Sequence, residues 1–252
     1  MPADNLQSKI RNPKSALRGE PSYVWRFGQN RRLELILKAL PLDARRMLVD
    51  GCGLGMYVKH LADFGYNVMG LDIEFERVAE GTRAGIEQLH VAAGEQLPYP
   101  DKTFDAVLSH EVIEHVADDR LAAQEMIRVL RPGGRVILFC PNRLYPFETH
   151  GHYWRGQYHF GNTPLINYLP NPIRDRLAPH VRAYTGRRLR TLFDRLPARV
   201  ITHTQLYPGY DNIVARRPAL GKVLRAVTYA FEHTPMRAFG LSHFVVVEKS
   251  ES

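Results

Sequence analysis

Three alternating glycines constrain this chain more than any other feature, because they follow one apolar run and precede a helical pattern. The apolar run is Met47–Val49, the glycines are Gly51, Gly53 and Gly55, and a second apolar run ends at Asp72. Glycines allow a tight turn and a close approach of the backbone to a ligand, and an acid after the second strand can bind ribose hydroxyls. The pattern predicts a nucleotide-cofactor site built from strand, glycine turn, helix and strand.

The spacing of these glycines distinguishes between cofactors. It is G-x-G-x-G, whereas dinucleotide-binding folds use G-x-G-x-x-G. A pyrophosphate requires a helix N-terminus pointing at it, and a cofactor that carries an amino-acid tail instead of phosphate does not. The spacing therefore disfavours a NAD-dependent oxidoreductase.

Three further motifs give the chain a family resemblance. They are Leu97–Asp105 (LPYPDKTFD), Glu111–Val116 (EVIEHV) and Leu130–Arg135 (LRPGGR). Together with the glycine turn, they make residues 48–140 resemble the class I S-adenosylmethionine (SAM)-dependent methyltransferases, in the type 11 subgroup near the quinone-biosynthesis enzymes. The resemblance implies an α/β fold with a Rossmann-like sheet, mostly parallel with the last strand antiparallel, and helices on both faces. It also implies SAM as the cofactor and leaves the acceptor open.

Strand and helix patterns alternate along the chain, which favours a parallel sheet covered on both faces. We expect strands at 46–50, 67–71, 87–91, 104–109, 135–140, 200–206 and 244–248, and helices at 28–40, 54–65, 74–85, 118–130 and 189–196. Residues 1–27 are interpreted as an N-terminal tail and cofactor lid, and residues 28–252 as the methyltransferase domain. That domain has two insertions, an irregular cap at 141–186 after strand five and a second insertion at 207–242.

The resemblance assigns the methionine part of SAM to the three glycines and the ribose to Asp72. An alternative role for Asp72 is to cap the following helix. The chain departs from the family at Val49, where an acid is usual, and Asp50 follows one residue late. A shift of one residue turns a strand side chain to the other face, so Asp50 is a cofactor contact only if it reaches SAM from the loop.

A second departure concerns the adenine. Ala93 stands where the family usually has an acid for the adenine amine. Gly94 and Glu95 are therefore the candidate adenine contacts, and His110 is a further candidate at the cofactor.

A candidate metal site follows strand four. Glu111, Glu114 and His115 are spaced i, i+3 and i+4, which on a helix places them on one face. Two carboxylates and an imidazole can hold Mg²⁺, Mn²⁺ or Zn²⁺. The resemblance extends to quinone and small-RNA methyltransferases that bind a metal at this motif with one downstream ligand, for which we select His150. The alternative is that these residues make structural hydrogen bonds.

Two histidines are candidate catalytic bases. Methyl transfer needs mainly alignment and exclusion of water, but a hydroxyl acceptor also benefits from a base, and imidazole exchanges protons near neutral pH. His150 is the first candidate because it follows strand five, where the cap meets the methyl group, and His110 is the second. The alternative for each is a structural role.

The net charge of +8 is unevenly distributed. Residues 47–150 hold 9 Lys/Arg and 16 Asp/Glu (−7), residues 151–252 hold 15 and 6 (+9), and residues 1–46 hold 10 and 4 (+6). The acidic core suits a cationic sulfonium cofactor. The basic flanks suit an anionic acceptor, an anionic membrane surface or nucleic acid, or they are simply solvated.

Localisation and membrane contact are predicted from apolar patterning. The chain has no run of 18 apolar residues, its start lacks a signal-peptide pattern, and Cys52 and Cys140 fit buried thiols, so we expect a cytoplasmic protein. Residues 218–239 carry an apolar stripe at helical spacing: Leu220, Val223, Leu224, Val227 and Phe231. We expect it to pack on the sheet. The alternative is a peripheral helix at a membrane, because basic residues flank the stripe.

We therefore expect a SAM-dependent enzyme that methylates oxygen on a small-molecule or lipid-linked acceptor. One alternative is an RNA or DNA methyltransferase that uses the basic flanks. It is disfavoured because Ser109-His110-Glu111-Val112 follows strand four in place of an Asn/Asp-Pro-Pro-aromatic motif. The other is a non-catalytic SAM-fold interaction protein, which the Val49 and Ala93 departures allow.

Overall fold

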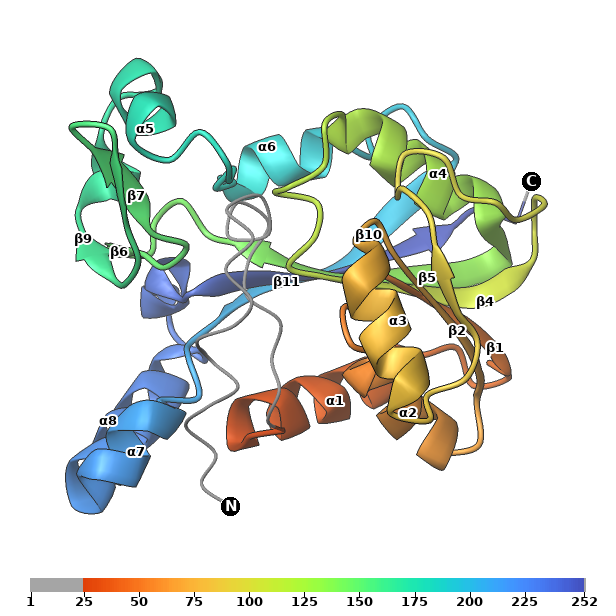
Figure 1. Ribbon diagram of the computed structural model, residues 1–252, viewed down its shortest axis with the longest axis horizontal. Helices are drawn as coiled ribbons and strands as arrows, with labels where there is room; N and C mark the ends of the chain where they lie inside the picture. Colours follow the sequence, from red (N-terminus) through yellow and green to blue (C-terminus); the bar gives the residue numbers. More distant parts are fainter. Residues whose placement is uncertain (1–24, 252) are drawn as a thin grey trace.

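A seven-stranded sheet organises the molecule. The computed structural model describes residues 25–251, and its sheet has the order β10-β11-β5-β4-β1-β2-β3 (Figure 1). The strands are β1 Arg46–Asp50, β2 Asn67–Asp72, β3 Leu89–Val91, β4 Phe104–His110, β5 Leu130–Pro141, β10 Ala198–Leu206 and β11 Ser242–Lys249. In this sheet β11 runs antiparallel to both neighbours and all other pairs are parallel. The predicted Rossmann-like sheet with an antiparallel last strand is confirmed.

Helices cover both faces of the sheet. They are α1 Phe27–Ala39, α2 Met56–Asp63, α3 Phe75–Arg83, α4 Asp119–Val129 and α6 Gly186–Thr191. Side chains alternate along each strand, so Val107 of β4 packs with α4 and α6 in one hydrophobic cluster, and Leu108 packs with α1 and α2 in the other. The strands are apolar on both faces because both faces are covered.

The segment 141–186 after β5 has regular structure, so the expectation of an irregular cap was wrong. It contains β6 Phe147–Glu148 paired with β9 Thr163–Pro164, β7 His152–Trp154 paired with β8 Gln157–His159, η3 Ile166–Tyr168 and α5 Asn171–Leu177. These short elements lie beyond the end of the sheet at which β5 terminates (Figure 1). We keep the name cap for this segment.

The second insertion forms a helical hairpin, which we define as α7 Asp211–Arg216 and α8 Pro218–Phe231, followed by η4 Pro235–Phe239. The hairpin lies on the same side of the molecule as the cap (Figure 1). Asn142 joins the stems of the two insertions, because its side-chain amide donates to the carbonyls of Ala238 and Gly240, each at 2.8 Å.

The apolar stripe of α8 does not pack on the sheet, so that expectation was wrong. Gly221 is buried and faces Val214 of α7, whereas Leu220 is 53% exposed and Val223 61%. The hairpin instead docks on the start of α1, where Arg225 lies 3.8 Å from the ring of Phe27. The stripe therefore points outward.

Three further expectations from the sequence concern the cysteines, the N-terminal tail and membrane-spanning helices. Cys52 and Cys140 are free, buried thiols, as predicted. Most of the proposed tail and lid, residues 1–24, lies outside the described residues. Within the described part of the chain, no helix has both the length and the apolarity needed to cross a membrane.

Candidate functional site

The glycine turn between β1 and α2 is open on the side where a ligand would approach. Gly51 adopts φ +67°, and a Cβ there would lie 2.2 Å from a methyl carbon of Val112, so only glycine fits. Gly53 adopts φ +56°, and no atom lies within 4 Å of the position its Cβ would take. Gly55 caps α2 at φ +82°. Tight packing at the first glycine and open space at the second suit a loop that wraps a small molecule.

Asp72 holds this loop from the end of β2. Its Oδ2 accepts a hydrogen bond from the Gly53 amide and its Oδ1 from the Glu74 amide, both at 2.9 Å. The N-cap of α3 is Glu74, so Asp72 does not cap that helix. Each carboxylate oxygen keeps a second lone pair, which a ribose hydroxyl can use.

Asp50 belongs to the same end of the sheet despite its one-residue shift. Its carboxylate is buried, and one oxygen would lie 2.9 Å from a Cβ at Gly94, so the loop after β3 passes directly over it. Burial, reinforced by the charges of Asp72 and Glu95, raises the pKa of Asp50 to about 7. Three acids therefore meet here, which suits a cationic cofactor.

Glu95 connects this end of the sheet to the segment after β4. Its Oε1 accepts a hydrogen bond from the Ala117 amide at 2.7 Å. The segment that carries the Glu-rich motif is therefore held against the cofactor loops at two points, Val112 over Gly51 and Ala117 at Glu95.

The Glu-rich motif is a turn, so its spacing does not place Glu111, Glu114 and His115 on one face of a helix. Glu111 adopts φ +56°, which is incompatible with a helix, and residues 113–115 form a turn. Its Oε1 accepts hydrogen bonds from Arg32 at 3.2 Å and from the Ser242 hydroxyl at 2.9 Å. Glu111 therefore does not join the other predicted ligands.

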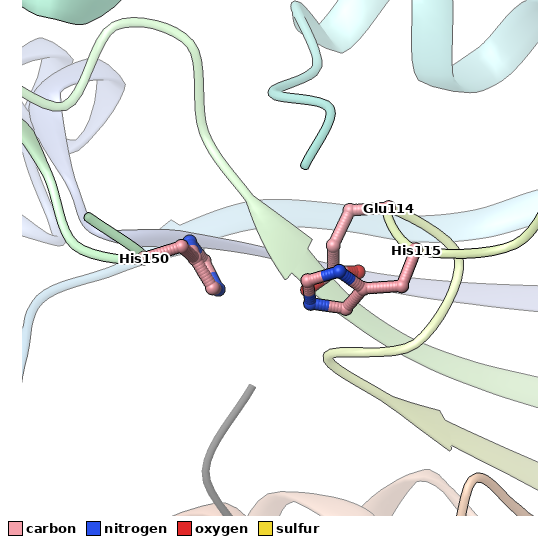
Figure 2. A group of neighbouring side chains, drawn as sticks. All are labelled: Glu114, His115 and His150. Carbon is pink, nitrogen blue, oxygen red and sulfur yellow. The ribbon is translucent and has the colours of Figure 1, made fainter. Parts of the chain in front are cut away.

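Glu114, His115 and His150 do come together, as Figure 2 shows. One ligand atom from each lies within 4.8 Å of the others, and we call this group the EHH cluster. Glu114 is 1% exposed, and neither of its carboxylate oxygens has a hydrogen-bond partner among the described residues. Burial and the nearby Glu111 raise its pKa well above the ordinary value. A buried carboxylate without a partner is costly, and a bound cation would remove that cost.

Both histidines of the cluster are oriented by hydrogen bonds. The Nδ1 of His115 lies 3.0 Å from the carbonyl oxygen of His180, and the Nδ1 of His150 lies 3.2 Å from Oε1 of Glu148. Each Nδ1 therefore carries the proton, and each Nε2 presents its lone pair. Burial, followed by the charge of His150, lowers the pKa of His115 to about 4, which keeps that imidazole neutral. This donor set fits a divalent cation.

Glu148 is the anchor of this arrangement. It is 2% exposed, and besides His150 it binds the buried Arg174 at 3.0 Å. Although burial opposes its ionisation, its hydrogen bonds with His150 hold its pKa below the ordinary value. An ionised Glu148 fixes the ring of His150 either as a metal ligand or as a base.

His110 has a different environment from His150. Its Nε2 lies against the guanidinium of Arg32, which can only donate, so the lone pair of His110 is already used. Burial and Arg32 lower the pKa of His110 to about 3. His110 is thus a neutral, engaged side chain, and His150 is the better placed of the two candidate bases. Sequence reasoning missed Arg32, because it lies on α1, far from any motif.

Comparisons with known proteins agree with this geometry. Residues 48–138 match a family model described as a methyltransferase domain. A probable SAM-dependent methyltransferase of Mycolicibacterium smegmatis is 36% identical over 118 residues, which cover 45% of this chain and 46% of the relative. A crystal structure of a SAM-dependent methyltransferase from Mesorhizobium loti superposes with a TM-score of 0.61 at 19% identity, covering 86% of this chain and 96% of that one.

Residues 48–138 therefore form a methyltransferase domain, and the chain has the fold of the class I SAM-dependent methyltransferases. SAM is accordingly the cofactor of this fold, and the open Gly53 backbone and the acids Asp50 and Asp72 fit it.

These curated relatives match less than half of this chain. A ubiquinone biosynthesis O-methyltransferase of Rhizobium etli is 34% identical over 111 residues, which cover 42% of this chain and 44% of the relative. The chain thus spans less than half the length of the relatives it matches. The matched residues 48–138 hold the glycine turn and the Glu-rich motif, and His150 and the whole cap lie beyond them.

Proposed function

We propose that this methyltransferase transfers the methyl group of SAM to an oxygen of a small-molecule or lipid-linked acceptor. The observation that carries the proposal is the packing of the turn with Glu114 and His115 directly on the cofactor loops, through Val112 at Gly51 and Ala117 at Glu95. An acceptor hydroxyl at the EHH cluster would then lie next to the cofactor.

The residues have a limited task in this reaction, because the sulfonium already activates the methyl carbon. The chain has to align the acceptor oxygen with that carbon, exclude water and accept the hydroxyl proton. Glu114, His115 and His150 would hold a divalent cation, which lowers the pKa of an acceptor hydroxyl when bound. Without a cation, His150 would take the proton at Nε2, and the ionised Glu148 would stabilise the imidazolium.

Two groups of relatives support oxygen as the acceptor atom. One is the ubiquinone biosynthesis O-methyltransferases, and the other includes a probable chloroplastic tocopherol O-methyltransferase of Oryza sativa, 33% identical over 139 residues. The latter match covers 49% of this chain and 38% of the relative. An N-methyltransferase, the norajmaline enzyme of Rauvolfia serpentina, also matches at 38% over 102 residues, so the similarity alone does not select oxygen. The EHH cluster favours oxygen, because a cation or a His–Glu pair acts on a hydroxyl proton.

The exposed stripe of α8 supports a lipid-linked acceptor. Leu220, Val223 and Val227 are 53%, 61% and 46% exposed, and Arg216, Arg217 and Lys222 are exposed beside them. An apolar face flanked by cations is the pattern of helices that lie in the interface of an anionic membrane. We propose that the hairpin makes this peripheral contact.

The test is transfer of labelled methyl from SAM to catechol, a small acceptor with adjacent hydroxyls. We expect O-methylated product, loss of activity in excess chelator, and recovery with Mg²⁺, Mn²⁺ or Zn²⁺. His150→Gln should lose activity, and His152→Gln should keep it, because His152 stacks on His159 outside the cluster. Full activity in chelator together with loss in His150→Gln would assign the base mechanism. Retained activity in both would refute a role for the cluster.

A further inference from the structure

A cavity of about 520 Å³ lies between the cap and the turn after β4. Its walls come from α5 and the residues that follow it, from residues 114–116 and from the start of α6. Four arginines line it: Arg143, Arg174, Arg182 and Arg188. The volume is in the range of small-molecule sites, so the concentration of one charge there requires an explanation.

Only one of the four arginines is well neutralised. Arg174 is paired with Glu148 at 3.0 Å and also lies 3.6 Å from Asp175. Arg143 donates to the carbonyl of Leu169 at 2.6 Å, and no acid pairs with it among the described residues. A hydrogen bond to a carbonyl satisfies a donor but leaves the positive charge in place.

Arg182 and Arg188 add to this excess. Arg182 donates to the carbonyls of Val116 and Ala117, and Arg188 lies 3.7 Å from Asp119, with a side chain 55% exposed. The acids that line the cavity are Glu114 and Asp175, so its four arginines outnumber its acids. The walls therefore carry a net positive charge.

The environment of Arg143 favours an anion as the ligand of this cavity. Burial, and then the neighbouring charge of Arg174, lower the pKa of Arg143. Two guanidiniums that repel each other in a shared cavity are stabilised by an anion between them. Guanidinium groups bind carboxylate and phosphate oxygens in pairs of hydrogen bonds, which gives geometry as well as charge.

The cavity is continuous with the candidate site, because Glu114 and His115 of the EHH cluster also line it. We propose that the arginines bind an oxyanion of the acceptor, a carboxylate or a phosphate, and so direct its hydroxyl toward the EHH cluster. The inference rests on the proposed function and adds the substrate class, an acidic hydroxyl compound. It also gives the basic charge of the C-terminal half a specific location.

Binding of simple anions tests this inference without requiring catalysis. Inorganic phosphate and benzoate would be titrated by calorimetry into the full chain at constant ionic strength, with benzamide as a neutral analogue of benzoate. We expect one saturable site for at least one of the two anions and none for benzamide. Phosphate alone would identify a phosphate ester as the acceptor group, and benzoate alone a carboxylate.

Variants locate the site. Arg143→Gln and Arg188→Gln should each weaken anion binding at least fivefold, and Arg188 is the safer change for folding because it is more than half exposed. Arg187→Gln is the matched control, since it removes the same charge from the same helix at an exposed position outside the cavity.

Two outcomes would overturn the inference. One is the absence of saturable binding of either anion. The other is an equal loss in Arg187→Gln and in the two cavity variants. Binding of SAM, measured on the same samples, reports separately on the proposed function. Anion binding without SAM binding would refute the proposed function and leave the assignment of the cavity as an anion site standing. SAM binding without anion binding would refute the anion site and leave the proposed function standing.

Discussion

The cofactor end and the acceptor end of this molecule are built in opposite ways. At the cofactor end, buried acids at the ends of β1 and β2 meet a glycine turn, and all the pieces lie within residues 50–95. At the other end, which we call the acceptor end, arginines from the cap and from α6 line a cavity together with residues 114–116. The net charges of the two halves follow the same division, with −7 for residues 47–150 and +9 for residues 151–252. We propose that the acidic cofactor site lies next to a basic site that binds the acceptor.

The EHH cluster joins the two ends, and changing it should give the largest effect. Glu114→Gln keeps the shape of a buried side chain that has no hydrogen-bond partner among the described residues, but it removes a candidate metal ligand. We expect methyl transfer to fall about 10³-fold, roughly 4 kcal/mol, with SAM binding unchanged. Steady-state kinetics with saturating cation is the measurement. Wild-type kinetics in Glu114→Gln would separate the cluster from the reaction.

Asp50 provides a pH test that concerns only the cofactor end. The pKa of Asp50 is about 7 in the folded chain and has its ordinary value of 3.8 in the unfolded chain. Between pH 3.8 and pH 7, the folded protein therefore keeps a proton that the unfolded chain has lost. Stability of the SAM-free protein should therefore fall as pH rises from 4 to 7, with Asp50 contributing roughly 3 kcal/mol.

Chemical denaturation across this pH range measures the contribution. Asp50→Asn should flatten the decline, whereas Asp63→Asn should not, because Asp63 is an exposed partner of Lys59. Equal pH profiles for wild type and Asp50→Asn would contradict a raised pKa of the buried Asp50.

Variants of the helical hairpin test whether this end of the molecule contacts a membrane. Arg216→Gln with Arg217→Gln should weaken flotation with anionic vesicles by about 30-fold, since each basic residue near such a surface contributes about 1 kcal/mol. Arg176→Gln with Arg187→Gln removes the same charge from exposed positions of α5 and α6 and is the matched control. No flotation of the wild type at low salt would remove the membrane contact and leave a soluble acceptor.

The two ends also differ in how well the sequence predicts them. The glycine turn and Asp72 follow from local spacing, and the structure brings them together as expected. Asp50 reaches the same end despite its shift, because it is the last residue of β1 and the loop at Gly94 passes over it. Local spacing succeeds here because the contacts are fixed by neighbouring parallel strands.

At the acceptor end, residue types were predicted better than geometry. Glu114, His115 and His150 meet as expected, but Glu111 adopts a positive φ and pairs with Arg32. The Arg32 contact spans 79 residues and has no local signal. The α8 stripe has helical spacing, but periodicity alone does not tell whether a protein core or a lipid surface faces it.

Calorimetric titration of the full chain with SAM and with NAD tests the central claim most directly. The account predicts one SAM site and no NAD binding. Asp72→Ala should weaken SAM binding at least tenfold, because hydrogen bonds to a charged group contribute about 1.5–3 kcal/mol each. Asp63→Ala and Glu114→Gln should bind SAM as the wild type does. Binding of NAD, failure to bind SAM, or unchanged affinity in Asp72→Ala would contradict the account.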